Sequence, residues 1–236
     1  MSGQRLGNYL IEDRLGQGGV ATVWRARHRY LGTVHALKVL SRPSPKALTR
    51  LLREGRVQAQ LQHPAVVPVT DIIVDEERVA LAMPLITGGT LDEWMRRNGP
   101  LAPDRALALF RPILEAVVHA HAAGVLHRDI KPQNVLMEGE QPRVADFGIA
   151  RLCDDDEDPV ITRVGAPMGT LGFCSPEQWA NASQVDPRAD VFSLGALLFY
   201  LLSGRAPFDE DSPTSTLRNT LTGRHPDLRR LVPECP

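Results

Sequence analysis

Hydrophobic periodicity changes near residue 88, and this change constrains the fold more than any other feature of the sequence. Before that point, apolar and polar residues alternate in short runs separated by glycine-bearing turns, as in YLIEDRLG, ATVWRARH and VHALKVL. Beyond it, apolar residues recur at helical spacing, at Leu107, Phe110, Leu114, Val117 and Val118. Alternation is typical of half-buried strands, and the longer spacing is typical of amphipathic helices. The pattern therefore predicts an α+β chain with a sheet-rich first part and a helical second part.

Prolines and glycines divide the first part, residues 1–86, into a small antiparallel sheet and one helix. The three alternating runs predict three strands, and a helix is expected from Pro45 to Gln62, closed by His63-Pro64. Two further strand-like runs, VVPVTDIIV and RVALAMPLI, complete the sheet.

The second part, residues 87–236, is predicted to be mainly helical. A long amphipathic helix is expected between about Pro103 and Ala123, a short strand from Pro142 to Ala145, and a strongly apolar helix near residues 188–203. A hinge between the two parts is placed near residues 84–89.

Charge and cysteine content exclude several classes of protein. The 27 basic and 28 acidic residues give a net charge of -1, so no global field attracts nucleic acid or a membrane surface. The three cysteines are odd in number and far apart, which indicates neither a disulfide framework nor a CxxC metal site and favours a reducing cytoplasm. No signal peptide is recognisable, and the longest apolar run, Leu194 to Leu202, contains Gly195 and is far shorter than the roughly 20 residues that span a bilayer. We expect a cytoplasmic chain without a membrane segment of its own, and leave open an anchor after Pro236.

A glycine-rich turn, LGQGGVATVW, lies between the first two long strands at residues 15–24. Glycine lets the backbone approach a phosphate closely, but a strand on both sides argues against a Rossmann or P-loop site. Taken alone, the segment fits a plain glycine turn equally well.

Lys38 stands among apolar neighbours on the third strand, in HALKVL. A lysine there requires an acidic partner if its ammonium is directed away from water, and Glu54 on the following helix is the best candidate. The alternative is a solvated strand lysine.

The loop HRDIKPQN, residues 127–134, gathers chemistry that a structural loop does not need. Asp129 can accept or orient a hydroxyl proton, Lys131 can neutralise charge on a phosphoryl group, and Asn134 can ligate a metal through its oxygen. His127 is expected to pack beneath the loop. Asp146, in DFG at the end of a short strand, is suited to Mg²⁺.

In this order along the chain, the motifs resemble those of a protein kinase domain, and more narrowly of the bacterial serine/threonine kinases of eukaryotic type. Gly169-Thr170, SPEQ at 175–178 and Asp190 in an apolar helix extend the resemblance. It implies a two-lobed fold with a small antiparallel sheet and one main helix in the amino-terminal lobe and a mainly helical carboxy-terminal lobe. It also implies transfer of the γ-phosphate of ATP, with Mg²⁺, to Ser or Thr hydroxyls of protein substrates.

Residue roles follow from the resemblance alone. Catalysis falls to Asp129, Lys131, Asn134, Lys38 and Glu54. Contacts with ATP fall to Leu15, Gly16, Gly18, Gly19, Val23, Ala36, Lys38, Met83, Pro84, Ile86, Leu136 and Asp146. Metal binding falls to Asn134 and Asp146, and contacts with the substrate segment to Thr170 and Glu177. Arg128 is expected to dock a phosphorylated Thr162, which implies autophosphorylation, with self-association if it occurs in trans. The acidic run at 154–158 is interpreted as solvated, or alternatively as a substitute for that phosphate.

Three features depart from the family pattern. Ala21 stands where a third loop glycine often lies, and Gly55, directly after Glu54, costs about 1 kcal/mol of helix propensity and is expected to loosen that helix. The family's arginine partner of Glu177 has no counterpart before Pro236, which predicts a buried carboxylate without a partner. The alternative functions are a truncated, non-catalytic kinase-like binding module and a small-molecule phosphotransferase; the SPEQ segment argues against the second.

Overall fold

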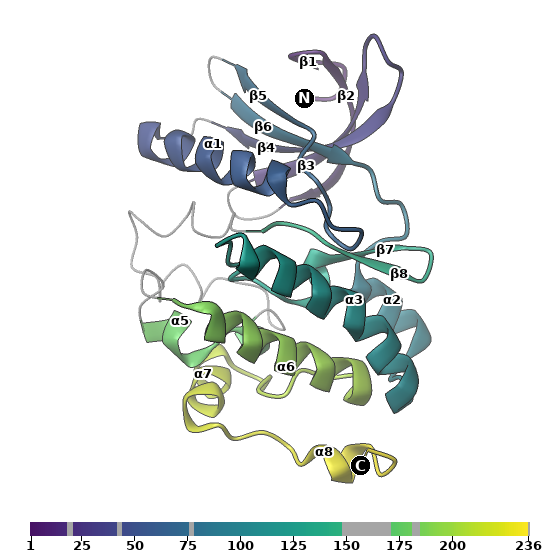
Figure 1. Ribbon diagram of the computed structural model, residues 1–236, viewed down its shortest axis with the longest axis vertical. Helices are drawn as coiled ribbons and strands as arrows, with labels where there is room; N and C mark the ends of the chain where they lie inside the picture. Colours follow the sequence, from purple (N-terminus) through teal and green to yellow (C-terminus); the bar gives the residue numbers. More distant parts are fainter. Residues whose placement is uncertain (18–20, 42–43, 76–77, 148–170, 181–184, 236) are drawn as a thin grey trace. The chain divides into compact units, whose positions relative to one another are not determined.

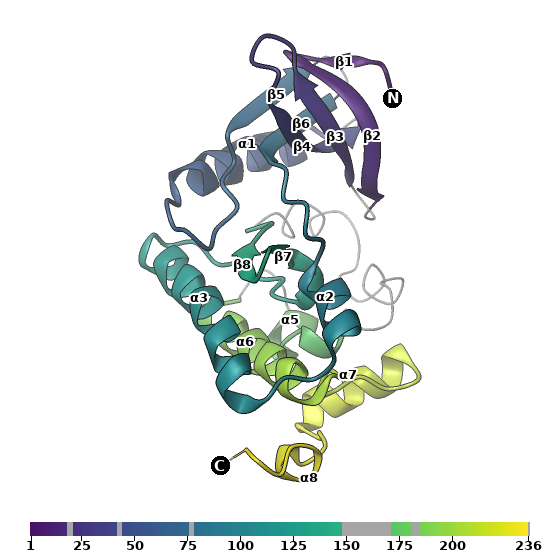
Figure 2. The same cartoon turned by 90° about the vertical axis from the view of Figure 1, so that its right-hand side faces the viewer.

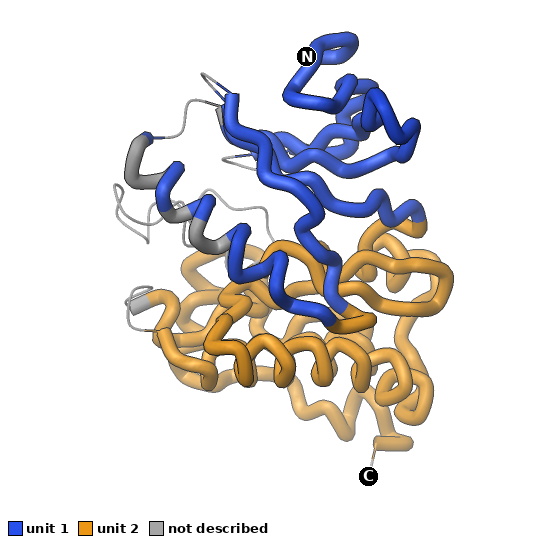
Figure 3. The backbone as a smooth tube through the Cα atoms, turned by 45° about the horizontal axis from the view of Figure 1, so that its top comes forward, with its two compact units in different colours: residues 1–62, 66–87 blue, residues 63–65, 88–236 orange. Residues whose placement is uncertain are grey.

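The structure is a computed structural model, and it describes residues 1–17, 21–41, 44–75, 78–147, 171–180 and 185–235. The chain forms two compact units (Figure 3). Unit 1 comprises Met1–Gln62 and Val66–Thr87, and unit 2 comprises His63–Ala65 and Gly88–Pro236.

Unit 1 is an antiparallel six-stranded sheet with one helix, α1 (Figure 1). The strand order is β1-β2-β3-β4-β6-β5. The elements of unit 1 are β1 (Arg5–Leu6), β2 (Tyr9–Gln17), β3 (Ala21–His28), β4 (Val34–Ser41), α1 (Pro45–Gln60), β5 (Asp71–Asp75) and β6 (Arg78–Pro84).

The two faces of this sheet bury different partners. One face forms an apolar core of Leu6, Tyr9, Ile11, Ala26, Leu37, Val39, Ile73, Ala80 and Ala82. Successive residues of a strand point to opposite faces. Ile72 and Leu81 therefore point away from this core and toward α1, which crosses the sheet (Figure 1).

Helix α1 approaches the sheet closely at Gly55. A Cβ atom built on this buried glycine would lie 2.8 Å from Cδ1 of Ile72 and 3.2 Å from Cδ2 of Leu81. The helix packs this tightly only because residue 55 has no side chain. The close packing on Ile72 and Leu81 is a role of Gly55 that was not expected from the sequence, and loosening of the helix by this glycine stays a prediction.

Unit 2 is mainly helical, with one β-hairpin. Its elements are α2 (Leu91–Asn98), α3 (Pro103–Ala122), η1 (Pro132–Asn134), β7 (Val135–Glu138), β8 (Gln141–Val144), η3 (Leu171–Phe173), α5 (Pro176–Ala180), α6 (Pro187–Ser203), α7 (Pro213–Thr222) and α8 (Leu228–Leu231). Helices α3 and α6 run side by side in both ribbon views (Figures 1 and 2). Most residues of α6 are buried, as expected for the central helix of a unit.

Most of the predicted elements are confirmed, with two kinds of difference. The run VVPVTDIIV, residues 66–74, becomes a strand only from Asp71 onward, in β5, because Pro68 has no N–H to donate to a ladder. The short elements β1, α2, η3, α5, α7 and α8 were not predicted. A sequence signal existed for α2, since Thr90 and Glu93 have the spacing of a capping box. In the structure, Oγ1 of Thr90 accepts the Glu93 N–H at 3.2 Å, and Oε2 of Glu93 accepts the Thr90 N–H at 2.9 Å. Among the helices in the described ranges, none has both the length and the apolar composition to cross a bilayer.

Candidate functional site

In unit 1, several of the predicted nucleotide contacts lie in one row across the sheet. Gly16 on β2 is paired with Val23 on β3, Val23 with Lys38 on β4, and Lys38 with Leu81 on β6. Directly paired residues share a face of the sheet, so Lys38 and Val23 face the same side as Leu81, the side covered by α1. Ala36 is paired with Met83 two positions along the same strands.

Other predicted residues of unit 1 are placed differently or lie outside the description. Leu15 is 49% exposed on β2, Ile86 follows β6, and Pro84 is paired with His35 and so alternates to the other face. Glu54 lies on α1 next to Gly55, which contacts the Lys38 row through Leu81, but its side chain is outside the described set. Gly18 and Gly19 lie outside the described residues.

In unit 2, three residues of the loop between α3 and β7 are brought into direct contact. Nζ of Lys131 lies 2.8 Å from Oδ2 of Asp129. Nδ2 of Asn134 donates to the same Oδ2 at 2.8 Å and to the Asp129 carbonyl oxygen at 2.7 Å. One cation and one amide thus orient the carboxylate, which remains partly exposed. An oriented, accessible carboxylate can accept a proton from a hydroxyl group.

The backbone of this loop is fixed by Asp190, the buried carboxylate of α6. Oδ2 of Asp190 accepts the His127 N–H at 2.8 Å and Nε2–H of His121 at 2.8 Å, and Oδ1 accepts the Arg128 N–H at 2.7 Å. Arg128 has φ of 67°, a region that non-glycine residues rarely adopt. Asp190 therefore holds two successive backbone N–H groups at a strained position, one residue before Asp129.

His127 connects the loop to the segment that carries Asp146. Its ring is fully buried, its Nδ1 accepts the Asp129 N–H at 3.2 Å, and its Nε2–H donates to the Ala145 carbonyl at 2.9 Å. The ring centroid is 4.6 Å from that of Phe147. Burial lowers the pKa of His127, and nearby carboxylates oppose this only in part. The neutral ring thus links the Asp129 N–H to the Ala145 carbonyl through two hydrogen bonds.

Asn134 and Asp146 supply the oxygen donors that a hard cation requires. The Ala145 N–H donates to the Asn134 carbonyl at 2.9 Å, which brings Asp146, with φ of 64°, next to Asn134. Since Nδ2 of Asn134 is committed to Asp129, its Oδ1 remains available for a metal. A carboxylate and an amide oxygen fit Mg²⁺, which typically takes few ligands from protein. Leu136, a predicted contact with ATP, lies on β7 two residues after Asn134 and is half-buried.

The predicted substrate segment is described only in part. Thr162, Thr170 and the acidic run 154–158 lie outside the described residues. Glu177, on α5, is exposed, so the prediction of a buried carboxylate is wrong. Its charge also helps to raise the pKa of Arg188, although hydrogen bonds to Asp186 are the main cause. Glu177 therefore has a cation nearby and needs no buried partner.

Gln178, the neighbour of Glu177, is a residue that motif reading did not single out. It is 4% exposed, and its Nε2–H donates to the Arg128 carbonyl at 2.6 Å. A glutamine within a recognised motif carries no signal for such a contact, because its partner lies 50 residues away in the chain.

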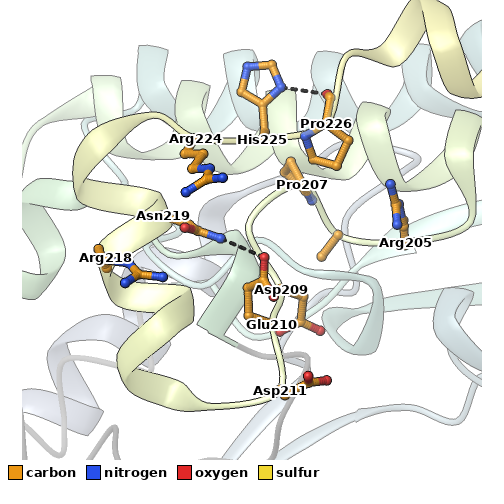
Figure 4. A pocket seen from close by; sticks show the side chains of 11 residues that line it. Arg205, Pro207, Asp209, Glu210, Asp211, Arg218, Asn219, Arg224, His225 and Pro226 are labelled. Carbon is orange, nitrogen blue, oxygen red and sulfur yellow. Dashed lines mark hydrogen bonds between the residues drawn. The ribbon is translucent and has the colours of Figure 1, made fainter.

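A separate concave region of unit 2 lies among α7 and the segments on either side of it (Figure 4). Its volume is about 770 Å³, and its charged lining residues are Arg205, Arg218, Arg224, Asp209, Glu210 and Asp211. Figure 4 shows Arg218 and Arg224 on one side of Glu210 and Arg205 on the other. The three arginines balance the three carboxylates, so the lining favours no net charge in a ligand. Among the predicted site residues that the structure describes, none lines this region, and the candidate site remains the Asp129 loop.

Comparisons with known proteins agree with this geometry. The protein kinase domain model matches residues 9–231. The chain is 40% identical to the serine/threonine-protein kinase PkaA of Streptomyces coelicolor, over 96% of this chain and 44% of that protein. It is 35% identical to the kinase pkn3 of Myxococcus xanthus, over 96% of this chain and 43% of that protein.

A solved structure, residues 1–466 of Rad53 in complex with AMP-PNP, superposes with a TM-score of 0.76 at 27% identity and covers 93% of this chain and 54% of that one. The chain spans 44% and 43% of the two curated relatives named above. Because the family model matches most of the chain and the motif residues gather around Asp129, the chain belongs to the protein kinase family.

Proposed function

We propose that this chain is an ATP-dependent protein serine/threonine kinase. The observation that carries the proposal is the Asp129 carboxylate, oriented by Lys131 and Asn134 on a loop whose backbone is fixed by Asp190. Oriented general bases and cations account for most of the catalysis of phosphoryl transfer, since the reaction depends on positioning and charge stabilisation.

In unit 1, the row containing Gly16, Val23 and Lys38 forms the nucleotide-facing surface. Val23 and Ala36 pack on the adenine, and Lys38 binds the α- and β-phosphates while paired with Glu54. The pairing is supported by Gly55, because the glycine after Glu54 packs on Leu81, the cross-strand neighbour of Lys38.

In unit 2, the acceptor hydroxyl donates its proton to Asp129, and Lys131 stabilises the negative charge of the transferring phosphoryl group. Asn134 and Asp146 would hold Mg²⁺, which supplies charge neutralisation at the phosphates. Lysine two positions after the base is the serine/threonine pattern of the family, so Ser and Thr hydroxyls of proteins are the proposed acceptors.

Regulation by autophosphorylation of Thr162, with Arg128 as its docking partner, remains a prediction from the family pattern, as does self-association of two copies. A cytoplasmic location likewise remains a prediction from the cysteine content. Mass-spectrometric mapping of the phosphorylated protein tests the first, because an unmodified Thr162 in fully active protein contradicts it.

The test of the proposed function is transfer of labelled phosphate from Mg·ATP to a generic basic protein. Asp129→Asn keeps the size of the side chain and an oxygen that can accept hydrogen bonds, but it removes the carboxylate that acts as the base. We therefore expect turnover to fall by on the order of a hundredfold or more. Gln141→Glu, an exposed change in the same unit, should leave turnover within twofold.

Equal residual signal from the wild type and Asp129→Asn would refute the enzyme function. Retained binding of an ATP analogue in that case would identify a non-catalytic binding module instead.

A further inference from the structure

The side-chain amide of Gln178 joins two segments that are distant in sequence. Nε2–H donates to the Arg128 carbonyl at 2.6 Å, while Oε1 accepts both the backbone N–H and the hydroxyl of Ser175 at 3.1 Å. Gln178 is 4% exposed and Ser175 is fully buried. The amide orientation is unambiguous, because a carbonyl can only accept and a backbone N–H can only donate.

The Arg128 carbonyl belongs to the peptide group that leads directly into Asp129. The N–H of that same peptide group donates to Nδ1 of His127 at 3.2 Å. Both polar ends of this peptide are therefore held by buried side chains, Gln178 on the oxygen and His127 on the nitrogen. Fixing both ends fixes the plane of the peptide, and hence the position of the Asp129 Cα atom from which the side chain leaves the backbone.

The strained backbone at Arg128 makes this restraint important. With φ of 67°, Arg128 occupies a conformation that persists only where surrounding contacts impose it. Asp190 restrains the N–H side of Arg128, but its carboxylate can only accept and so cannot restrain the carbonyl. Gln178 supplies the donor, from a side chain that is itself almost fully buried.

Glutamine is suited to this position because its side-chain amide carries both a donor and an acceptor. An ionised glutamate would keep the contacts with Ser175 but place a second acceptor against the Arg128 carbonyl, whereas a protonated one could still donate to it. A methionine would keep the length and apolar volume but lose both contacts. The side chain thus couples Ser175, next to the predicted substrate segment, to the base loop.

We propose that Gln178 is a positioning residue, which sets the orientation of Asp129 through the Arg128–Asp129 peptide and couples it to the segment Leu171–Ser175. This inference rests on the proposed kinase function, since its consequence is the placement of the base. It does not require Gln178 to touch substrate or nucleotide.

The test compares Gln178→Met and Gln178→Glu with the wild type and with Gln141→Glu, the exposed control. We expect kcat for the protein substrate to fall on the order of tenfold to a hundredfold in Gln178→Met, as for a small displacement of a base. In Gln178→Glu, burial favours the protonated acid, whose O–H can still donate to the Arg128 carbonyl, so this variant should lose less activity. The KM for ATP should stay within about twofold, because no nucleotide contact is altered. A general loss of fold would instead change kcat, KM and the unfolding midpoint together.

Amide hydrogen exchange provides a readout that does not depend on activity. Gln178→Met should accelerate exchange of the segment 127–131 by about tenfold, corresponding to one lost hydrogen bond, and leave α3 unchanged. Wild-type kcat with unchanged exchange in Gln178→Met would overturn the inference. If the wild type itself is no more active than Asp129→Asn, the kinase proposal fails, and the exchange experiment still decides whether Gln178 holds the loop.

Discussion

Replacing Asp190 tests whether one buried carboxylate holds the base loop in place. Its two oxygens accept three hydrogen bonds, from the backbone of His127, the backbone of Arg128 and the ring of His121, at 2.7 to 2.8 Å. The side chain is 1% exposed, so water cannot replace these contacts. The effect of its removal can therefore be worked out bond by bond.

Asp190→Asn should lose one of the three bonds. If the new amide oxygen takes the place of Oδ2, it keeps His127 and His121, while the amide nitrogen faces the Arg128 N–H, donor against donor. One unsatisfied buried donor costs about 1 to 3 kcal/mol. Asp190→Ala leaves both backbone N–H groups unsatisfied and should cost about 2 to 6 kcal/mol. Against a typical total of 5 to 15 kcal/mol, the second change threatens folding itself.

Urea unfolding followed by intrinsic fluorescence measures these differences, with Asp211→Asn as the control. Asp211 is an exposed carboxylate, and a change there should shift the unfolding free energy by less than about 0.5 kcal/mol. An Asp190→Ala variant no less stable than Asp211→Asn would refute the claim that this carboxylate supports the loop. The order of stability, wild type above Asp190→Asn above Asp190→Ala, is the specific expectation.

Three further predictions concern packing and protonation. Gly55→Val should destabilise unit 1 by about 1 to 3 kcal/mol, because its side chain must displace Ile72 and Leu81. Gly195→Ala, at an exposed helical position with open space around it, should stabilise the protein by up to about 1 kcal/mol. Thermal unfolding of both variants distinguishes the effect of close packing from that of helix propensity. Burial lowers the pKa of His127 below that of the unfolded chain, so its contribution to stability is complete above about pH 6.5 and is lost as the pH falls further; a ring titrating at or above that value by NMR would contradict this. Burial, and then the charge of Asp92, raise the pKa of Tyr200, so stability should fall as the pH rises above about 10. Tyr200→Phe should make that fall smaller in urea unfolding experiments but not abolish it, because burial also raises the pKa of Tyr9.

Local physics explains why the larger elements could be predicted from the sequence. The alternation of β2 to β4 and the helical spacing of α3 reflect burial of one face, which each segment displays by itself, whereas β6 and α6 are recognisable as strongly apolar runs. The short strands and helices could not be predicted from periodicity. A two-residue strand such as β1 or a four-residue helix such as α8 has no period to detect, and Pro68 interrupted a run that otherwise read as one strand.

In the candidate site, too, contacts between residues close in sequence could be predicted, and contacts between distant residues could not. Asp129, Lys131 and Asn134 are close in sequence, so their cooperation could be predicted from spacing, and the structure brings them into contact.

By itself, the sequence determined the fold class, the order of the motifs and the residue types available for phosphoryl transfer. Tertiary structure decided the rest: that Gly55 permits close packing of α1, that Glu177 is exposed, and that Gln178 reaches the Arg128 carbonyl. Each of these depends on a neighbour distant in the chain, and only folding brings such a neighbour within the few ångströms over which packing and hydrogen bonding act.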